Sequence, residues 1–474
     1  MRMAPRARLA GSNLSGWMAP APDSGWGLAA LGLVPAIVFL AHFFYGAVLD
    51  QPAMALFAAL STLLLITLLA RRAREDLARL TPAAAVLLPF AAVILMAVLS
   101  LTPAAPGGPH PIWEWAGMAP AATMNKSATL IEIFKLLGLG SVFILGCLLG
   151  ATSERGRTVF GLILVLGCLY AIACLGLFLA GGQFAAGGGR LAGGFATPNV
   201  AGTQFGVLVV LASAWGVQRW RRASVQTAMD RIAGLAPLAA LLILFFACLL
   251  LTASRAAITA TLVAVLIFLG WSALDDRRSR GPLLALGGLL IVVAVLLLVQ
   301  GNTLFADRFG SFAQGDDTRS IVAAAHWRAF LDSPLIGYGL GTYPQVNNQI
   351  MTASNAGALS VSVVQHNAYL QWLEEAGLLG ATPMFALVAI ILAMTAWRSV
   401  HLPRNRTLVA GLLSASVVVL LHAAVDVPLN TPSFEAFWTL LLGLGFALSQ
   451  ARPRAFRSRG TAWALAEPSV RTRP

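Results

Sequence analysis

Long apolar runs fill most of this sequence, and they decide what the chain can fold into. Crossing the hydrocarbon core of a bilayer takes about 20 apolar residues per helix, and a spanning segment must satisfy its backbone hydrogen bonds internally. Twelve runs of that kind can be drawn, in a chain with 58% hydrophobic and 11% charged residues. Soluble domains do not have such a composition. The sequence therefore predicts an all-α, polytopic integral membrane protein with about 12 transmembrane helices.

These runs divide the chain into a membrane bundle, a large loop and two tails. Spans one to nine are predicted within residues 26–300, spans ten to twelve within 378–450, and a large helical loop, 301–377, separates them. Residues 1–25 and 451–474 are basic tails. The predicted spans cover residues 26–48, 53–70, 82–101, 130–151, 158–180, 198–217, 235–252, 256–274, 283–300, 378–397, 407–425 and 434–450.

The positions of the basic residues predict the orientation, because cytoplasmic loops keep an excess of Lys and Arg. With the amino terminus inside, 25 of the 32 Lys and Arg residues lie in the cytoplasm, six lie outside, and Lys135 is within a span. Both tails are then cytoplasmic, and the loop 301–377 is outside. The net charge of +13 reflects this topology and anionic lipids. No basic patch is interleaved with exposed aromatic residues, as a nucleic-acid site would require.

Two arginines on the predicted outer face have settings that suit an anion. Arg190 is surrounded by seven glycines in the loop 181–197, and Asn199 follows closely. Glycine lets the backbone approach a ligand, and a guanidinium group matches phosphate oxygens; a flexible turn with an incidental arginine is the alternative. Arg255 lies in a very tight turn between two spans, where it needs an anion. We favour a ligand phosphate over a structural carboxylate as that anion.

The loop 301–377 alternates helix and turn signals. Residues 321–331 have the apolar spacing of a helix, with Asp317 or Thr318 as its cap. The stretch 337–343 is rich in glycine and predicts a tight backbone turn. A nucleotide site is only weakly supported there, because no strand precedes the glycines and no GK[ST] sequence follows them.

The segment from residue 366 to residue 380 carries the polar groups that most strongly suggest function. His366, Asn367 and Glu375 lie within ten residues, directly before an apolar run. Ionisable groups at a membrane boundary are costly, which favours a functional role. His366 titrates near neutral pH and is the candidate base for an acceptor hydroxyl. Glu375 lies about two and a half helical turns further on and does not reach His366 through a straight helix, so Asn367 is the better partner.

Two more pairs of ionisable residues have helical spacing. Glu132 and Lys135 share one face of the fourth span, which predicts a satisfied pair within the membrane. His422 and Asp426 share a face near the outer boundary. Asp426 either orients His422 for a function or only satisfies its hydrogen bonding.

Together these segments resemble the membrane O-antigen ligases and their relatives, the lipid-linked glycan polymerases and protein O-oligosaccharyltransferases. The resemblance covers about residues 130 to 450. Some transferases and polymerases of this group carry a second histidine two residues before the His-Asn pair, where this chain has Val364; this departure disfavours a protein transferase. The matching segments, in the order typical of the family, are Arg190 to Asn199 (RLAGGFATPN), Leu251 to Arg255 (LTASR), Arg319 with Trp327, Pro334 to Tyr343 (PLIGYGLGTY), His366 to Gly380, and His422 to Asp426.

The resemblance implies a glycosyltransferase of the bacterial inner membrane. Such an enzyme transfers a glycan from undecaprenyl pyrophosphate to an acceptor at the periplasmic face. The acceptor is the lipid A core in the ligases and another glycan repeat in the polymerases. The residues assigned to catalysis are His366, Arg319 and Arg255, and those assigned to substrate binding are Arg190, Asn199, Asn367, Glu375, His422 and Asp426.

No metal and no other cofactor is predicted. Soluble glycosyltransferases often bind a divalent metal through an Asp-x-Asp pair, whereas Asp316 and Asp317 are adjacent, so that their side chains diverge on a helix. Arg190, Arg255 and Arg319 are expected to stabilise the pyrophosphate instead. Direct attack by the acceptor then gives a metal-independent reaction that inverts the anomeric centre.

Two other classes of protein share parts of this pattern. A polysaccharide transporter or flippase has a similar number of spans, but such proteins often contain repeated halves. No similarity between the halves is found here, and the polar residues collect on one face. A noncatalytic assembly protein on the same scaffold is the other alternative. The sequence leaves the glycan, the acceptor and the oligomeric state open.

Overall fold

A computed structural model describes the protein over most of its length. It covers residues 31–80, 84–181, 185–186, 189–222, 228–276, 312–362, 364–401 and 405–451, with four further residues between 280 and 288. The predicted amino-terminal tail 1–25, nearly all of the ninth span at 283–300, the start of the large loop and nearly all of the carboxyl-terminal tail lie outside the described residues.

The described chain is almost entirely helical, as the apolar runs predicted. The helices are α2 (Leu33–His42), α3 (Asp50–Leu68), α4 (Arg71–Ala78), α5 (Ala84–Ser100), α6 (Ile112–Trp115), α7 (Lys126–Gly150), α8 (Ser153–Leu179), α9 (Pro198–Arg222), α10 (Ala228–Leu251), α11 (Arg255–Asp275), α14 (Phe312–Asp332), α15 (Tyr343–Gln349), α16 (Ala356–Leu359), α17 (Ala368–His401), α18 (Arg406–Ala423), the 3₁₀ turn η2 (Pro428–Asn430) and α19 (Pro432–Leu448). Two short strands, β1 (Ala185–Ala186) and β2 (Arg190–Leu191), form a small antiparallel pair within the glycine-rich loop.

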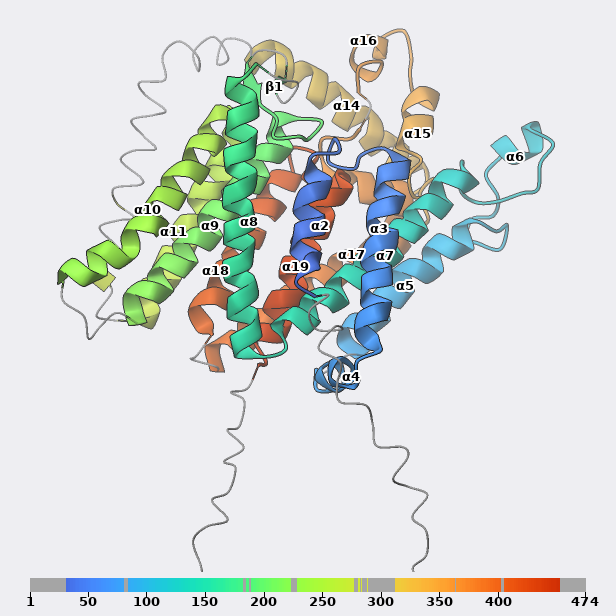
Figure 1. Cartoon of the computed structure of the whole chain (residues 1–474). Coiled ribbons are helices and arrows are strands. Elements are labelled where there is room, and N and C mark those ends of the chain that lie inside the picture. Colours follow the sequence, from blue (N-terminus) through green and yellow to red (C-terminus); the bar gives the residue numbers. More distant parts are fainter. Residues whose placement is uncertain are drawn as a thin grey trace, which may run out of the picture.

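The long helices run side by side in one bundle, with α14, α15 and α16 at its upper end and α4 at its lower end (Figure 1). Seven of the described helices are long and apolar enough to cross a membrane, and four shorter apolar helices accompany them. Each of these helices coincides with one of the predicted spans. The protein is therefore an all-α membrane protein.

Small residues hold the centre of this bundle together. α7 and α19 approach so closely that a Cβ atom on Gly146 would lie 2.5 Å from the Leu440 carbonyl oxygen. A Cβ atom on Gly150 would lie 2.5 Å from the Leu444 carbonyl oxygen. Backbone contact of this kind is how helices associate where the lipid is as apolar as the side chains. It places α19, and the loop before it, in the middle of the protein.

A glycine in α17 divides the large loop from the next span. Gly377 has φ 57° and ψ −174° inside α17, and a Cβ atom there would lie 2.4 Å from the Leu335 backbone. The kink lies where the sequence predicted the boundary between loop and span, but the helix itself begins nine residues earlier, at Ala368. The helix expected over 321–331 also starts earlier, at Phe312, so Asp317 and Thr318 lie inside α14, and the predicted cap was wrong.

Candidate functional site

One buried carboxylate, that of Asp426, joins several of the predicted site residues at the upper end of the bundle. Its Oδ2 atom accepts a hydrogen bond of 2.6 Å from the Asn199 side-chain nitrogen. Arg319 of α14 places a guanidinium nitrogen 3.7 Å from the same oxygen. The other carboxylate oxygen accepts the Val427 backbone N–H at 2.9 Å. Asp426 thereby connects the loop before α19 with α9 and α14.

Asn199 extends this connection to Arg190. The Arg190 guanidinium donates a hydrogen bond of 2.7 Å to the Asn199 side-chain oxygen, and its Nε donates to the Thr252 carbonyl oxygen at 2.8 Å. Thr252 lies three residues before Arg255, which begins α11. The structure therefore brings Arg190 to the turn that carries Arg255, although the two are 65 residues apart in the sequence.

His366 lies beside this group, just before α17. Its ring is half-buried, and burial lowers its pKa below the ordinary value of 6.5. The Asp426 carboxylate acts in the opposite direction and raises the pKa, while the Arg319 guanidinium lowers it. An imidazole with a lowered pKa is neutral at neutral pH and can accept a proton. Arg319, Asp426 and His366 are therefore close enough to influence one another electrostatically.

His422 of α18 binds a partner that sequence analysis missed. Its Nδ1 atom lies 2.6 Å from the Thr203 hydroxyl, which also lies 3.1 Å from the Asn199 carbonyl oxygen and donates to it. No hydrogen bond joins the His422 ring to the Asp426 side chain among the described residues, so the expected pairing of the two was wrong. Thr203 lies four residues after Asn199 on α9. That spacing was the only sequence signal for it.

The two remaining predicted residues, Asn367 and Glu375, hold the backbone around the site. The Asn367 side chain accepts the backbone N–H groups of Tyr369 and Leu370 at 3.0 and 3.1 Å, and so caps the start of α17. Glu375 accepts the backbone N–H of Gly341 at 2.8 Å and that of Tyr343 at 3.1 Å. No hydrogen bond between the Asn367 side chain and the His366 ring is found among the described residues, and the role of Asn367 beside His366 stays a prediction.

Glu375 thus fixes the glycine-rich turn that the sequence predicted. Gly337, Gly339 and Gly341 in this turn all have positive φ angles, of 66°, 102° and 76°. A side chain at Gly339 would also clash with Thr123, since its Cβ atom would lie 1.9 Å from that hydroxyl. Glycine is needed there for both reasons. The turn is a structural feature that seats α14 and α15 on α17.

Comparison with known families agrees with this arrangement. Residues 239–385 match the family described as O-antigen ligase. The match covers about a third of the 474-residue chain and supports its resemblance to the O-antigen ligases. A search of the curated proteins gives no match. The matched segment contains Arg255, Arg319 and His366. The other residues of the site, Arg190, Asn199, His422 and Asp426, lie outside it.

Sequence analysis missed a second buried polar group in this protein. His326 of α14 and Glu374 of α17 are both fully buried, and the ring Nδ1 lies 2.8 Å from each carboxylate oxygen. The other ring nitrogen lies 3.1 Å from the Asn347 side-chain oxygen, and the ring stacks on Tyr343 with 4.4 Å between centroids. Since 48 residues separate His326 from Glu374, no local pattern signals the contact.

Proposed function

We propose that this protein is a glycosyltransferase of the bacterial inner membrane that moves a glycan from undecaprenyl pyrophosphate to an acceptor hydroxyl at the periplasmic face. The preferred acceptor is the lipid A core, as in O-antigen ligation. In this orientation both termini are cytoplasmic, and the upper end of the bundle in Figure 1 faces the periplasm. The match of residues 239–385 to the O-antigen ligase family supports this class of reaction.

The observation that carries the proposal is the gathering of cationic side chains around one carboxylate beside a neutral imidazole. Arg190 and Arg319 both connect to Asp426, one through Asn199 and one directly. Arg255 begins the helix after the turn that Arg190 contacts. Guanidinium groups gathered in this way suit a diphosphate, whose negative charge increases as the glycosidic bond breaks.

The proposed reaction is a single displacement. The acceptor oxygen attacks the anomeric carbon while the bond from that carbon to the pyrophosphate oxygen breaks, and the bonding electrons leave with the lipid diphosphate. His366 takes the proton from the acceptor hydroxyl, which its lowered pKa allows at neutral pH. Arg319 and Arg255 stabilise the leaving diphosphate. Attack opposite to the leaving group inverts the anomeric centre.

The other predicted residues act by positioning in this scheme. Asn199 and Asp426 hold Arg190 and Arg319 in place, and His422 supports Asn199 through Thr203. Arg190 binds the donor diphosphate. The contacts that Asn367 and Glu375 make suit a supporting role, and neither residue is assigned to substrate contact.

The deciding experiment measures glycan transfer by purified protein in lipid vesicles. The donor is an undecaprenyl pyrophosphate glycan, offered either with lipid A core or with further donor alone. Glycosylated lipid A core is the expected product; lengthening of the donor glycan instead would identify a polymerase, and the absence of both products would refute the proposal.

Substitutions of the proposed catalytic residues test their roles in the same assay. His366→Ala is expected to lower the rate by about 10²–10⁴-fold, and Arg319→Ala and Arg255→Ala by about 10²-fold or more. His401→Ala and Arg328→Ala are the controls, because both side chains are exposed, one at the end of α17 and the other on α14, the helix that carries Arg319. Parental transfer by a folded His366→Ala protein would remove His366 from the mechanism.

The metal-independence of the reaction is a separate part of the proposal. Positive charge from arginine supplies the stabilisation that a divalent ion provides in other glycosyltransferases. Excess chelator is therefore expected to leave the transfer rate unchanged. Loss of activity that added magnesium restores would show that a metal takes part.

A further inference from the structure

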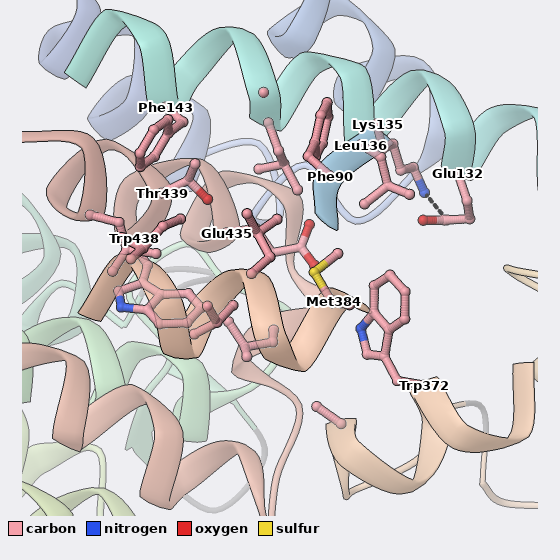
Figure 2. A pocket seen from close by; sticks show the side chains of 18 of the residues that line it. Phe90, Glu132, Lys135, Leu136, Phe143, Trp372, Met384, Glu435, Trp438 and Thr439 are labelled. Atoms are coloured by element: carbon pink, nitrogen blue, oxygen red, sulfur yellow. Dashed lines mark hydrogen bonds and ion pairs between the residues drawn. The ribbon is translucent and has the colours of Figure 1, made fainter. Parts of the chain in front are cut away.

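A large cavity lies within the membrane bundle. Its lining does not include Asp426, Arg319 or His366, but it reaches Val364 and Ala368 on either side of the His366-Asn367 pair. It has a volume of about 1130 Å³ and is bounded mainly by α5, α7, α17 and α19. That volume exceeds the usual range for small-molecule sites, about 300–1,000 Å³. Figure 2 shows apolar side chains such as Phe90, Leu136 and Trp438 along its walls. A cavity of this size and lining suits a long apolar ligand.

The cavity follows one face of α7 for much of the membrane thickness. The residues of α7 that line it run from Glu132 to Cys147 at helical spacing, a distance of about 22 Å. On α19 the lining runs in the same way from Glu435 to Phe446. The ionisable residues are at one end of each face, and the apolar residues follow. This is how a lipid is arranged, with its head group at one end and its hydrocarbon chain along the rest.

The wall of the cavity also reaches the outer surface of the bundle. Leu87 of α5 and Leu137 of α7 line the cavity, yet they are 57% and 44% exposed. These side chains lie on helices of membrane-spanning character, so the exposed surface faces hydrocarbon. A lipid can therefore enter from the bilayer without crossing water.

Charge at the polar end decides what head group fits. Lys135 contacts Glu132 at 2.7 Å and Asp50 at 3.5 Å, as the sequence predicted for the first of these pairs. Figure 2 shows the Glu435 carboxylate directed into the same space. Within the described part of the chain, no hydrogen bond or ion pair is found for this carboxylate, and the Lys135 ammonium, which acts on it at longer range, already pairs with Glu132 and Asp50. A carboxylate inside a membrane protein requires a cation or hydrogen-bond donors, and Glu435 is therefore the group that a ligand would satisfy.

We propose that this cavity binds a membrane lipid with a primary ammonium head group. The ammonium pairs with Glu435, and the hydrocarbon chain lies along α7 and α19. Lys135 has three N–H donors and two carboxylate neighbours, Glu132 and Asp50. The remaining donor faces the lipid phosphate. An anionic head group is disfavoured, because three carboxylates surround a single ammonium at this end.

The test compares three lipids with identical acyl chains and different heads. Purified protein is mixed with phosphatidylethanolamine, phosphatidylcholine or phosphatidylglycerol, and bound lipid is counted by native mass spectrometry. We expect ethanolamine lipid to bind about tenfold or more above the other two, because the choline ammonium has no N–H to donate and the glycerol head has no cation. Equal binding of the three lipids, or preference for phosphatidylglycerol, would overturn the proposal. This comparison needs only the parent protein.

Two variants then separate head-group from chain recognition. Glu435→Gln keeps the size of the side chain and is expected to abolish the preference for ethanolamine lipid, while Glu114→Gln, on the exposed helix α6, keeps it. Leu442→Trp places an indole in the apolar part of the cavity and is expected to reduce binding of all three lipids. A folded Glu435→Gln protein that still prefers ethanolamine lipid would refute the role of Glu435. None of these measurements involves glycan transfer, so they are independent of the proposed reaction.

Discussion

The buried pair of His326 and Glu374 offers a direct test of how the large loop is held on the membrane bundle. Asn347 donates from its side-chain nitrogen to the Leu359 and Ser362 carbonyl oxygens, so its own oxygen faces the His326 ring. Both ring nitrogens thus face acceptor oxygens, so the ring is held by hydrogen bonds on both sides. Because neither side chain is exposed, removal of one partner leaves the other buried and unsatisfied.

The expected size of the effect follows from that burial. Leaving a buried donor or acceptor without its partner costs about 1–3 kcal/mol, which at about 2 °C per kcal/mol lowers the melting temperature by roughly 2–6 °C. Glu374→Leu and His326→Phe are each expected to show such a loss. The Phe ring preserves the stack on Tyr343. The double variant has no buried charge and is expected to lose clearly less than the sum of the two.

The assay is thermal unfolding of the purified protein, followed together with limited proteolysis of the large loop. Transfer activity should fall with Glu374→Leu, because Arg319 lies two helical turns before His326 on α14, and His366 lies just before the helix that carries Glu374. Losses below about 1 kcal/mol for both single variants, or strict additivity in the double variant, would show that the two side chains are not coupled.

Three further predictions concern the site and the kink. The transfer rate should fall on acidification with a midpoint below pH 6.5, because protonation removes the neutral His366 that accepts the proton. Arg319→Gln should move that midpoint up and Asp426→Asn should move it down, because Arg319 lowers and Asp426 raises the pKa of His366. An unchanged pH profile in both variants would contradict this. Asn199→Ala should lower the transfer rate by about 10–100-fold, because it removes the hydrogen bonds to Arg190 and Asp426. A variant whose transfer rate equals that of the parent at every donor concentration would argue against this role. Gly377→Ala should lower the melting temperature strongly because the position has φ 57° and no room for a Cβ atom, whereas Gly176→Ala in α8, which has open space, should not.

Two polar residues at the end of the large loop have structural contacts rather than a proposed catalytic role. Glu374 and Glu375 are adjacent in the sequence, and both are buried. One binds the His326 ring, and the other binds the backbone of the glycine-rich turn. Together they connect α14 and α15 to the start of α17. The candidate site therefore depends on contacts made by residues that do not belong to it.

The local structure of this protein could largely be predicted from the sequence alone. Membrane-spanning helices follow from apolar length, since each helix satisfies its own backbone hydrogen bonds wherever it lies. The pair of Glu132 and Lys135 is confirmed at 2.7 Å, because helical spacing is enough to bring the two side chains together. The glycine-rich turn at 337–343 is also confirmed, since positive φ angles select glycine locally. Each of these features depends on neighbours within a few positions.

Only the tertiary structure decided which partners the polar side chains meet. Asn199 and Asp426 are 227 residues apart, and His326 and Glu374 are 48 apart, so helix packing brings each pair together. His422 was expected to pair with Asp426 four residues away, but its ring faces Thr203 on another helix. The physical reason is that a hydrogen bond requires two atoms about 3 Å apart, and for distant residues this distance is set by how whole helices pack, which no local pattern contains.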